Sequence, residues 1–181
     1  NTQGGGSVTA NPDLTKYECG ANVTLEAFPE LGHLFSDWSG SVAGTSNPIN
    51  VTIGQNTQVT ATFTTAPERE LTITTNGNGG VNVNPPKSGY LHGEVVTLTA
   101  VPGDGSNFID WSGNATGSTN PLTIVMDGDK TITANFEAKT YSLTVLILDG
   151  RGSVTTDPPG TLFSHGAKVQ LMANPIEGFY F

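Results

Sequence analysis

A four-residue string that occurs twice sets the strongest limit on how this chain can fold. Asp-Trp-Ser-Gly stands at Asp37–Gly40 and again at Asp110–Gly113, 73 residues later. A fixed period of this length indicates tandem copies of one structural unit. The same offset, held without a gap, pairs further prolines, glycines and aromatic residues: Pro12 with Pro85, Tyr17 with Tyr90, Gly20 with Gly93, Pro29 with Pro102, Phe35 with Phe108, Gly44 with Gly117, Asn47-Pro48 with Asn120-Pro121, and Phe63 with Phe136.

The offset also defines how the chain is organised. It continues past residue 140, where Pro158, Gly166 and Pro175 match positions in the second copy, but no third Asp-Trp-Ser-Gly follows. The chain therefore holds two copies and part of a third, which we call repeats 1, 2 and 3. The predicted boundaries are repeat 1 at 1–63, lacking its first strand; a linker at 64–70; a complete repeat 2 at 71–136; a linker at 137–140; and the first half of repeat 3 at 141–181.

Within each copy, apolar and polar residues alternate in short runs, which is the pattern of β-strands with one face turned inward. Asn-Gly, Pro-Pro and Asp-Gly pairs between these runs are typical of turns. No apolar stripe with helical spacing lasts for three turns. We therefore predict an all-β fold of tandem small β-rich units, with six short strands in each and little or no helix. The runs are 23–27, 49–53 and 59–63 in repeat 1; 71–73, 81–83, 96–100, 122–126 and 132–136 in repeat 2; and 141–147, 152–156 and 168–173 in repeat 3.

Composition and charge exclude several classes of function. The formal net charge is −9 with only seven Lys and Arg residues, so we predict no nucleic-acid partner, because phosphate binding relies on those side chains. No apolar run approaches the roughly 18 residues of a membrane span. The single cysteine, Cys19, rules out a disulfide within the chain. Asn1 opens without a signal peptide, so we expect that any such segment was removed or lies upstream.

Together these motifs resemble the divergent form of the internalin B-type repeat of bacterial surface and secreted proteins. The resemblance covers essentially the whole chain, although repeat 3 has Phe163 where repeat 2 has Tyr90. It implies a β-grasp-like or sandwich-like unit, strung in tandem as a stalk, spacer or adhesion module, with an extracellular or cell-surface location. In repeat 2 the pattern is carried by Leu71–Thr74, Gly79–Val81, Pro85, Tyr90–Gly93, Val96–Pro102, Phe108–Gly113, Asn120–Leu122 and Thr133–Phe136.

Four aromatic residues are candidates either for a ligand site or for the core: Phe35, Trp38, Phe108 and Trp111. Exposed rings that stack on sugars would make them a carbohydrate site. Alternatively, tryptophan closes the core, because it is the largest apolar residue available to a small unit. We expect the core role, with both tryptophans mostly buried against the neighbouring phenylalanines, including Phe63 and Phe136.

The polar motifs do not form a recognisable active site. Asp37 and Asp110 precede the tryptophans, and we expect them to accept hydrogen bonds from nearby loop amides. A catalytic carboxylate would need a second acid–base group repeated close by, and the sequence shows none. We predict that the chain is not an enzyme and that it has no catalytic residue and no cofactor.

We also predict no metal site. Asp127-Gly128-Asp129 looks like a fragment of a calcium loop, but it lacks the several oxygen ligands that calcium needs, and we expect a hairpin turn. His92 and His165 align with each other and with Cys19, which places them in separate repeats. His33 has no histidine counterpart in the other copies.

The predicted function is a structural or adhesive extracellular repeat segment that acts as a spacer or a self-assembling module of a surface protein or filament. The alternative is a carbohydrate-binding module of a secreted hydrolase. The partners expected are neighbouring repeats or further copies of the same protein, and a polysaccharide under the alternative. Repeat 3 leaves its inward face without a lid, and we expect a neighbouring chain or a continuation of the protein to cover it. That face comprises Leu143, Val145, Val154, Val169 and Leu171.

Overall fold

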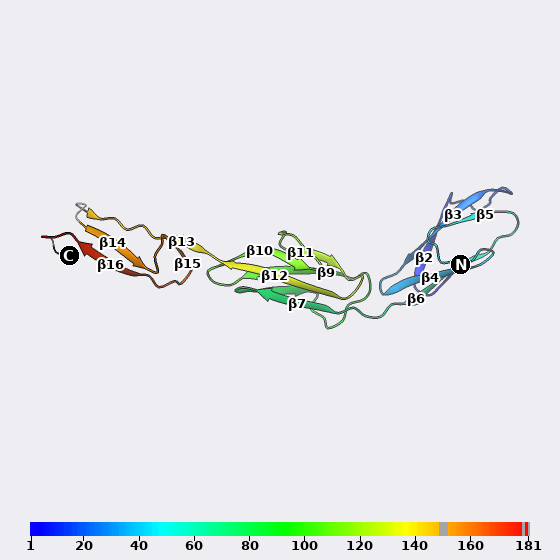
Figure 1. Cartoon of the computed structure of the whole chain (residues 1–181). Coiled ribbons are helices and arrows are strands. Elements are labelled where there is room, and N and C mark those ends of the chain that lie inside the picture. The colour runs from blue at the N-terminus through cyan, green and yellow to red at the C-terminus, as the bar shows by residue number, and fades with distance from the viewer. Residues whose placement is uncertain (149–151, 179, 181) are drawn as a thin grey trace. The chain divides into compact units, whose positions relative to one another are not determined.

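The computed structural model describes residues 1–148, 152–178 and 180, and its regular elements are β-strands (Figure 1). Within this part of the chain no α-helix forms. The all-β fold that the alternating residues predicted is confirmed. A Thr-rich chain with apolar residues at every second position suits a pleated surface with one buried face.

The strands of repeat 1 recur in repeat 2 with the offset of the sequence. Residues Gly6 and Gly79, 73 positions apart, open equivalent strands, and the four strands β8 to β11 keep the bounds of β2 to β5 under that shift. Repeat 2 has the six strands predicted. Those of repeat 1 are β1 (Thr2–Gln3), β2 (Gly6–Asn11), β3 (Asn22–Pro29), β4 (His33–Gly40), β5 (Ile49–Thr52) and β6 (Val59–Thr65). Those of repeat 2 are β7 (Leu71–Asn76), β8 (Gly79–Asn84), β9 (Val95–Pro102), β10 (Ser106–Gly113), β11 (Leu122–Val125) and β12 (Lys130–Ala138).

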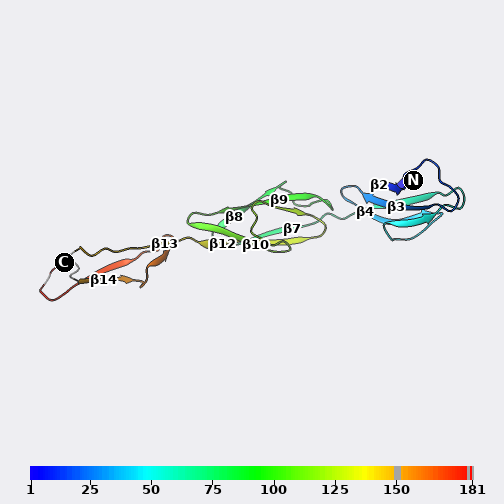
Figure 2. The ribbon, with the colours of Figure 1, turned by 90° about the horizontal axis from the view of Figure 1, so that it is seen from above.

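Each of these two repeats contains two three-stranded sheets. In repeat 1 the strand orders are β2-β3-β5 and β1-β6-β4, and in repeat 2 the equivalent orders are β8-β9-β11 and β7-β12-β10 (Figures 1 and 2). Most neighbours are antiparallel, but β1 pairs with β6 in parallel, with Thr2 opposite Ala61. The first and last strands of a repeat are therefore adjacent. Both last strands continue into the predicted linkers, since β6 ends at Thr65 and β12 at Ala138.

A bulge in the strand that carries Asp-Trp-Ser-Gly explains the spacing of its aromatic residues. Phe35 and Trp38 are three positions apart, so in a regular strand they would face opposite sides of the sheet. The register between β4 and β6 shifts between Phe35 and Asp37, which places one extra residue there. This shift returns both rings to the same face. The strand β10 has the same shift between Phe108 and Asp110.

The core of repeat 1 lies between its two sheets. Ala27 from one sheet is buried with Trp38, Ala61 and Phe63 from the other. Partly buried apolar residues from five strands surround this cluster: Val8, Leu25, Phe35, Ile49 and Val59. The sandwich-like arrangement follows, because each sheet has one apolar face and covers that of the other.

By its internal contacts the chain divides into two compact units whose boundary does not follow the repeats. The first consists of Asn1–Thr72, Asn84–Thr97 and Thr123–Lys130. The second consists of Ile73–Val83, Leu98–Leu122 and Thr131–Phe181. Repeat 2 therefore contributes residues to both units.

Repeat 3 is built from two short strand pairs. β13 (Thr140–Ser142) pairs with β15 (Leu162–Ser164), and β14 (Gly152–Asp157) pairs with β16 (Gln170–Pro175). The predicted strand at 141–147 is wrong beyond Ser142, since residues 143–147 form no strand. In repeat 2 the matching segment is β7, which has β12 as its hydrogen-bonded neighbour. Among the described residues, no sheet includes 143–147, although the Leu143 N–H donates to the Thr161 carbonyl at 2.8 Å.

Candidate functional site

In repeat 1 three aromatic side chains, Phe35, Trp38 and Phe63, pack together in a cluster that we call the aromatic centre. Trp38 is only 2% exposed. The ring of Phe35 lies 5.2 Å from the Trp38 ring and 6.0 Å from the Phe63 ring, in tilted and edge-on arrangements that aromatic pairs favour. The Trp38 Nε1–H donates to the carbonyl oxygen of Ser46 at 3.0 Å. The indole therefore has neither a free face nor a free polar edge for a sugar.

Repeat 2 reproduces this centre closely. Trp111 is 1% exposed, and the ring of Phe108 lies 5.1 Å from that of Trp111 and 5.8 Å from that of Phe136. The Trp111 Nε1–H donates to the carbonyl oxygen of Thr119 at 2.9 Å. Both tryptophans are thus buried, as the core interpretation expected.

The two aspartates that precede the tryptophans do not have the partners expected from the sequence. Asp37 accepts a hydrogen bond from the Ser36 hydroxyl at 2.7 Å. Asp110 accepts one from the Asn135 side-chain amide on β12, also at 2.7 Å. The expectation of loop amides is wrong, because the bulge turns these carboxylates toward side chains on their own strand or the adjacent one.

Two asparagines that the sequence interpretation treated only as part of a motif have a defined structural role. The side-chain amide of Asn47 bonds both backbone polar groups of Ala27, with both N–O distances at 2.8 Å. Asn120 does the same to Ala100. Each amide therefore acts as a short substitute for a neighbouring strand. The recurrence of Asn-Pro at the 73-residue offset was the signal available in the sequence.

The repeated tyrosines also bond within their own repeats. The Tyr17 hydroxyl donates to the Pro12 carbonyl at 2.7 Å, and the Tyr90 hydroxyl donates to the Pro85 carbonyl at 2.9 Å. Tyr90 is 2% exposed, whereas Tyr17 is half-buried. The same hydrogen bond thus closes the same loop in both repeats, although the Tyr90 ring is more fully buried than the Tyr17 ring.

Repeat 2 has two ion pairs that hold loops. Lys87 donates to the carboxylate of Glu94, which also accepts the Leu91 N–H at 3.0 Å. The hydrogen bond from Lys87 and then that from Leu91 hold the pKa of Glu94 below its usual range, although burial of the carboxyl acts in the opposite direction.

The Asp127-Gly128-Asp129 turn uses its carboxylates inside the protein. Lys130 lies 2.6 Å from Asp127 and lowers the pKa of that carboxyl. Asp129 accepts the Glu70 N–H at 2.9 Å. These contacts do not direct the two carboxylates toward one common position where a cation could bind.

The histidines and the cysteine do not come together as a metal site. Cys19 is exposed in repeat 1, and its Sγ lies 4.0 Å from the Gly54 carbonyl oxygen. His165 lies 3.6 Å from Asp104. The His33 Nδ1 lies 3.3 Å from the Leu31 carbonyl. Across residues 1–148, 152–178 and 180, no three metal-ligating side chains gather.

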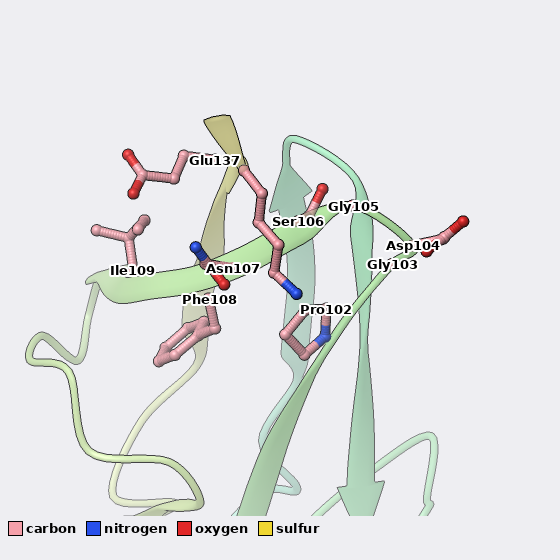
Figure 3. A pocket seen from close by; sticks show the side chains of 10 residues that line it. Pro102, Gly103, Asp104, Gly105, Ser106, Asn107, Phe108, Ile109 and Glu137 are labelled. Carbon is pink, nitrogen blue, oxygen red and sulfur yellow. The ribbon is translucent and has the colours of Figure 1, made fainter. Parts of the chain in front are cut away.

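A shallow depression of about 680 Å³ lies at the β9–β10 turn (Figure 3). Its lining residues are Pro102–Ile109, Glu137 and Lys139. Asp104 and Glu137 lie on opposite sides of the view in Figure 3, and Phe108 points down from β10. The two carboxylates of this depression therefore do not form an acid–base pair.

A larger groove of about 850 Å³ opens into the core of repeat 1. Apolar side chains from the two sheets line it together with the loop before β6. They include Val8, Val23, Leu25, Trp38, Val51 and Val59, and the loop contributes Gly54–Gln58. Cys19 and Asn1 lie at the same groove.

A family model described as the divergent InlB B-repeat domain matches residues 1–67 and residues 69–140. The chain belongs to this divergent InlB B-repeat family. The two matched segments coincide with the two copies that carry Asp-Trp-Ser-Gly, and the match ends before repeat 3. Divergent InlB B-repeats are modules of bacterial surface proteins, which identifies the general class of this chain. No curated protein and no solved structure gave a match.

Across residues 1–148, 152–178 and 180 of these InlB B-repeats, no helix is long and apolar enough to cross a bilayer.

Proposed function

We propose that this chain is a non-catalytic structural segment of an exported bacterial surface protein, in which the repeats serve as a spacer. The observation that carries the proposal is that the recurring Trp, Asn and Tyr side chains form hydrogen bonds within their own repeats. The indole N–H of Trp111, the amide of Asn120 and the hydroxyl of Tyr90 all bond backbone carbonyls of their own repeat. Their recurrence at the 73-residue offset is explained by folding, so no ligand is required to explain it.

Aromatic clusters that form within single repeats support the spacer role. The rings of Phe108, Trp111 and Phe136 meet within repeat 2 as Phe35, Trp38 and Phe63 do within repeat 1. A module whose core is closed by its own residues can be added or removed without rebuilding its neighbours. This independence is what a segment of variable length requires.

The alternative, a carbohydrate-binding module, has less support. Sugar binding by aromatic stacking needs an exposed ring face, and Trp38 and Trp111 are 2% and 1% exposed. The depression at the β9–β10 turn is lined mainly by polar and small side chains. We take this depression as the candidate glycan site for testing the alternative.

Two measurements test the proposal. A glycan array probed with the 181-residue chain should give no specific binding. Binding that Ile109→Ala or Asn107→Ala abolishes, while Glu26→Ala on β3 leaves it unchanged, would instead support the carbohydrate module.

The second measurement varies repeat number on a cell surface. The chain would be displayed between a membrane anchor and an epitope tag, with repeat 2 present once, twice or three times. We expect antibody access to the tag through a dense surface polysaccharide to rise with each added copy. Access that does not depend on copy number would contradict a spacer role.

A further inference from the structure

The linker between repeats 1 and 2 is hydrogen-bonded near both of its ends. The Ala66 N–H donates to the carbonyl oxygen of Gly32, in the turn between β3 and β4, at 2.9 Å, and Ala66 is buried. Further along, Arg69 and Tyr90 exchange two backbone hydrogen bonds, at 2.8 and 3.0 Å. A flexible connector leaves its peptide groups to water, so this linker is built as part of the fold.

The same turn of repeat 1 contacts the loop that precedes β9 of repeat 2. The Gly32 N–H donates to the carbonyl oxygen of His92 at 3.0 Å. A Cβ built on Gly32 would lie 3.4 Å from Leu91 Cδ2. One built on Gly93 would lie 3.8 Å from Leu31 Cδ1. Each segment therefore places a leucine against the glycine of the other.

The equivalent turn of repeat 2 makes the equivalent contact with repeat 3. The Lys139 N–H donates to the Gly105 carbonyl oxygen at 2.8 Å, which is the bond of the first linker at the 73-residue offset. Here a histidine covers the glycine, since a Cβ on Gly105 would collide with the His165 ring. The Nε2 of His165 lies 3.6 Å from Oδ2 of Asp104, which is the residue that matches Leu31.

The division of the chain into compact units agrees with these contacts. All residues of the first contact belong to one unit, and all residues of the second belong to the other. Neither 64–70 nor 137–140 is split between the units, whereas β9 is split between Thr97 and Leu98. Both linkers are therefore enclosed in compact parts of the chain.

We propose that the turn between β3 and β4, and its equivalent in repeat 2, is a docking surface whose partner is the next repeat of the same chain. The residue before the turn glycine selects the kind of contact. Leu31 is matched with Leu91 in an apolar contact. Asp104 is matched with a loop that has Ser164 in place of that leucine, so His165 covers the glycine. The inference rests on the proposed spacer function and adds that the joints between repeats are held in place.

Amide hydrogen exchange of the 181-residue chain, measured by NMR, tests this docking. The Gly32 and Ala66 amides should be protected. Leu31→Asp places a charge against Gly93 and should lower both protection factors at least tenfold. Leu14→Asp is the matched control and should leave them unchanged, because Leu14 and Leu31 are both 54% exposed in repeat 1. An unprotected Ala66 amide in the unaltered chain, or equal effects of the two aspartates, would overturn the proposal.

A double variant tests the matching of residues. Leu31→Asp combined with Leu91→Ser gives the first contact the residue types of the second, since His92 is already in place. Protection of the Ala66 amide should return to within about threefold of its value in the unaltered chain, as expected for coupled positions. The Trp38 amide, bonded to the Gly44 carbonyl at 2.8 Å inside repeat 1, should stay protected in every variant. A double variant that exchanges as fast as Leu31→Asp alone would refute the matching.

Two spin labels report on the joint itself. Glu26→Cys on β3 and Thr123→Cys on β11, in a Cys19→Ser background, place both labels at exposed positions of one compact unit. Double electron–electron resonance should give a narrow distance distribution that Leu31→Asp broadens. Equal widths in the two chains would refute docking at this turn. These measurements can fail while antibody access still rises with repeat number, and the reverse, so a failure of the docking and a failure of the spacer function are distinguishable.

Discussion

The Asn120 side chain forms hydrogen bonds with both backbone polar groups of Ala100. Its Oδ1 accepts the Ala100 N–H at 2.9 Å, and its Nδ2 donates to the Ala100 carbonyl at 2.8 Å. The amide is therefore matched to the strand edge as a neighbouring peptide group would be. A group with two acceptors, or with two donors, could satisfy only one side of this arrangement.

Asn120→Asp should therefore destabilise repeat 2. The carboxylate would face the Ala100 carbonyl without a proton to share, and we expect a loss of about 1–3 kcal/mol of unfolding free energy in urea. Asn114→Asp is the matched control, because Asn114 uses only its Oδ1, which accepts the Thr131 N–H at 2.7 Å. Equal losses in the two variants would argue against the two-sided role of Asn120.

Removal of the indole should be the most damaging single change in repeat 2. Trp111→Ala leaves a cavity beside Phe108 and deletes the bond to Thr119, and we expect a cost of about 3–5 kcal/mol. Trp111→Phe keeps part of the packing and should cost less. The measurement is the urea midpoint followed by far-ultraviolet circular dichroism. If Trp111→Ala unfolded at the wild-type midpoint, the core role of this residue would be wrong.

The close approach of Gly79 to an aromatic ring gives a prediction with an adjacent control. A Cβ on Gly79 would lie 2.5 Å from Phe136 Cζ, so Gly79→Ala should force the ring aside at a cost of about 1–3 kcal/mol. A Cβ on Gly80 would meet nothing within 4 Å. Gly80→Ala should be neutral or slightly stabilising in the same thermal unfolding experiment, because it reduces the freedom of the unfolded chain. The reverse order of the two midpoints would contradict the packing of β8 on Phe136.

Acid should weaken repeat 2 through Glu94. The folded protein holds the pKa of this carboxyl below its unfolded value. The stabilising contribution is therefore complete above the ordinary glutamate pKa of about 4.3 and is lost as the pH falls from there through the lower folded pKa. Glu94→Gln should flatten the dependence of the unfolding midpoint on pH in that acidic window. Glu137→Gln, which removes an exposed carboxylate on β12, should keep the wild-type slope; an unchanged slope in Glu94→Gln would reject the assignment.

The repeat and its strands could be predicted from the sequence because both leave periodic signals. The offset between Trp38 and Trp111 fixed the unit, and alternation fixed most strands to within about two residues. It indicated no run at β2, β4 or β10. The bulge was harder, because nothing in Phe-x-x-Trp by itself states which residue is extra. The spacing of Phe35 and Trp38 did contain the clue, since two core residues three positions apart are incompatible with an unbroken strand.

The remaining differences between the predicted and the observed structure depend on contacts between residues that are distant in sequence. Residues 143–147 have the alternation of a strand, yet a strand also requires a hydrogen-bonded neighbour. The partners of Asp37 and Asp110 depended on which side chains the bulge brought alongside. The groove of repeat 1 depends on how far neighbouring strands cover its core, since Leu25 is half-buried where Leu98 is fully buried.

The adjacency of β7 and β12 has a mechanical consequence. They are the first and last strands of repeat 2, and they run in the same direction, as the pairs Thr74–Thr133 and Asn76–Asn135 show. Tension on the two ends of the repeat would pull β7 backward and β12 forward, along the strands and across their hydrogen bonds. All the bonds of the pair are then loaded in shear at once, so none can open ahead of the others as in the unzipping of a hairpin. A repeat connected in this way resists stretching at its own ends.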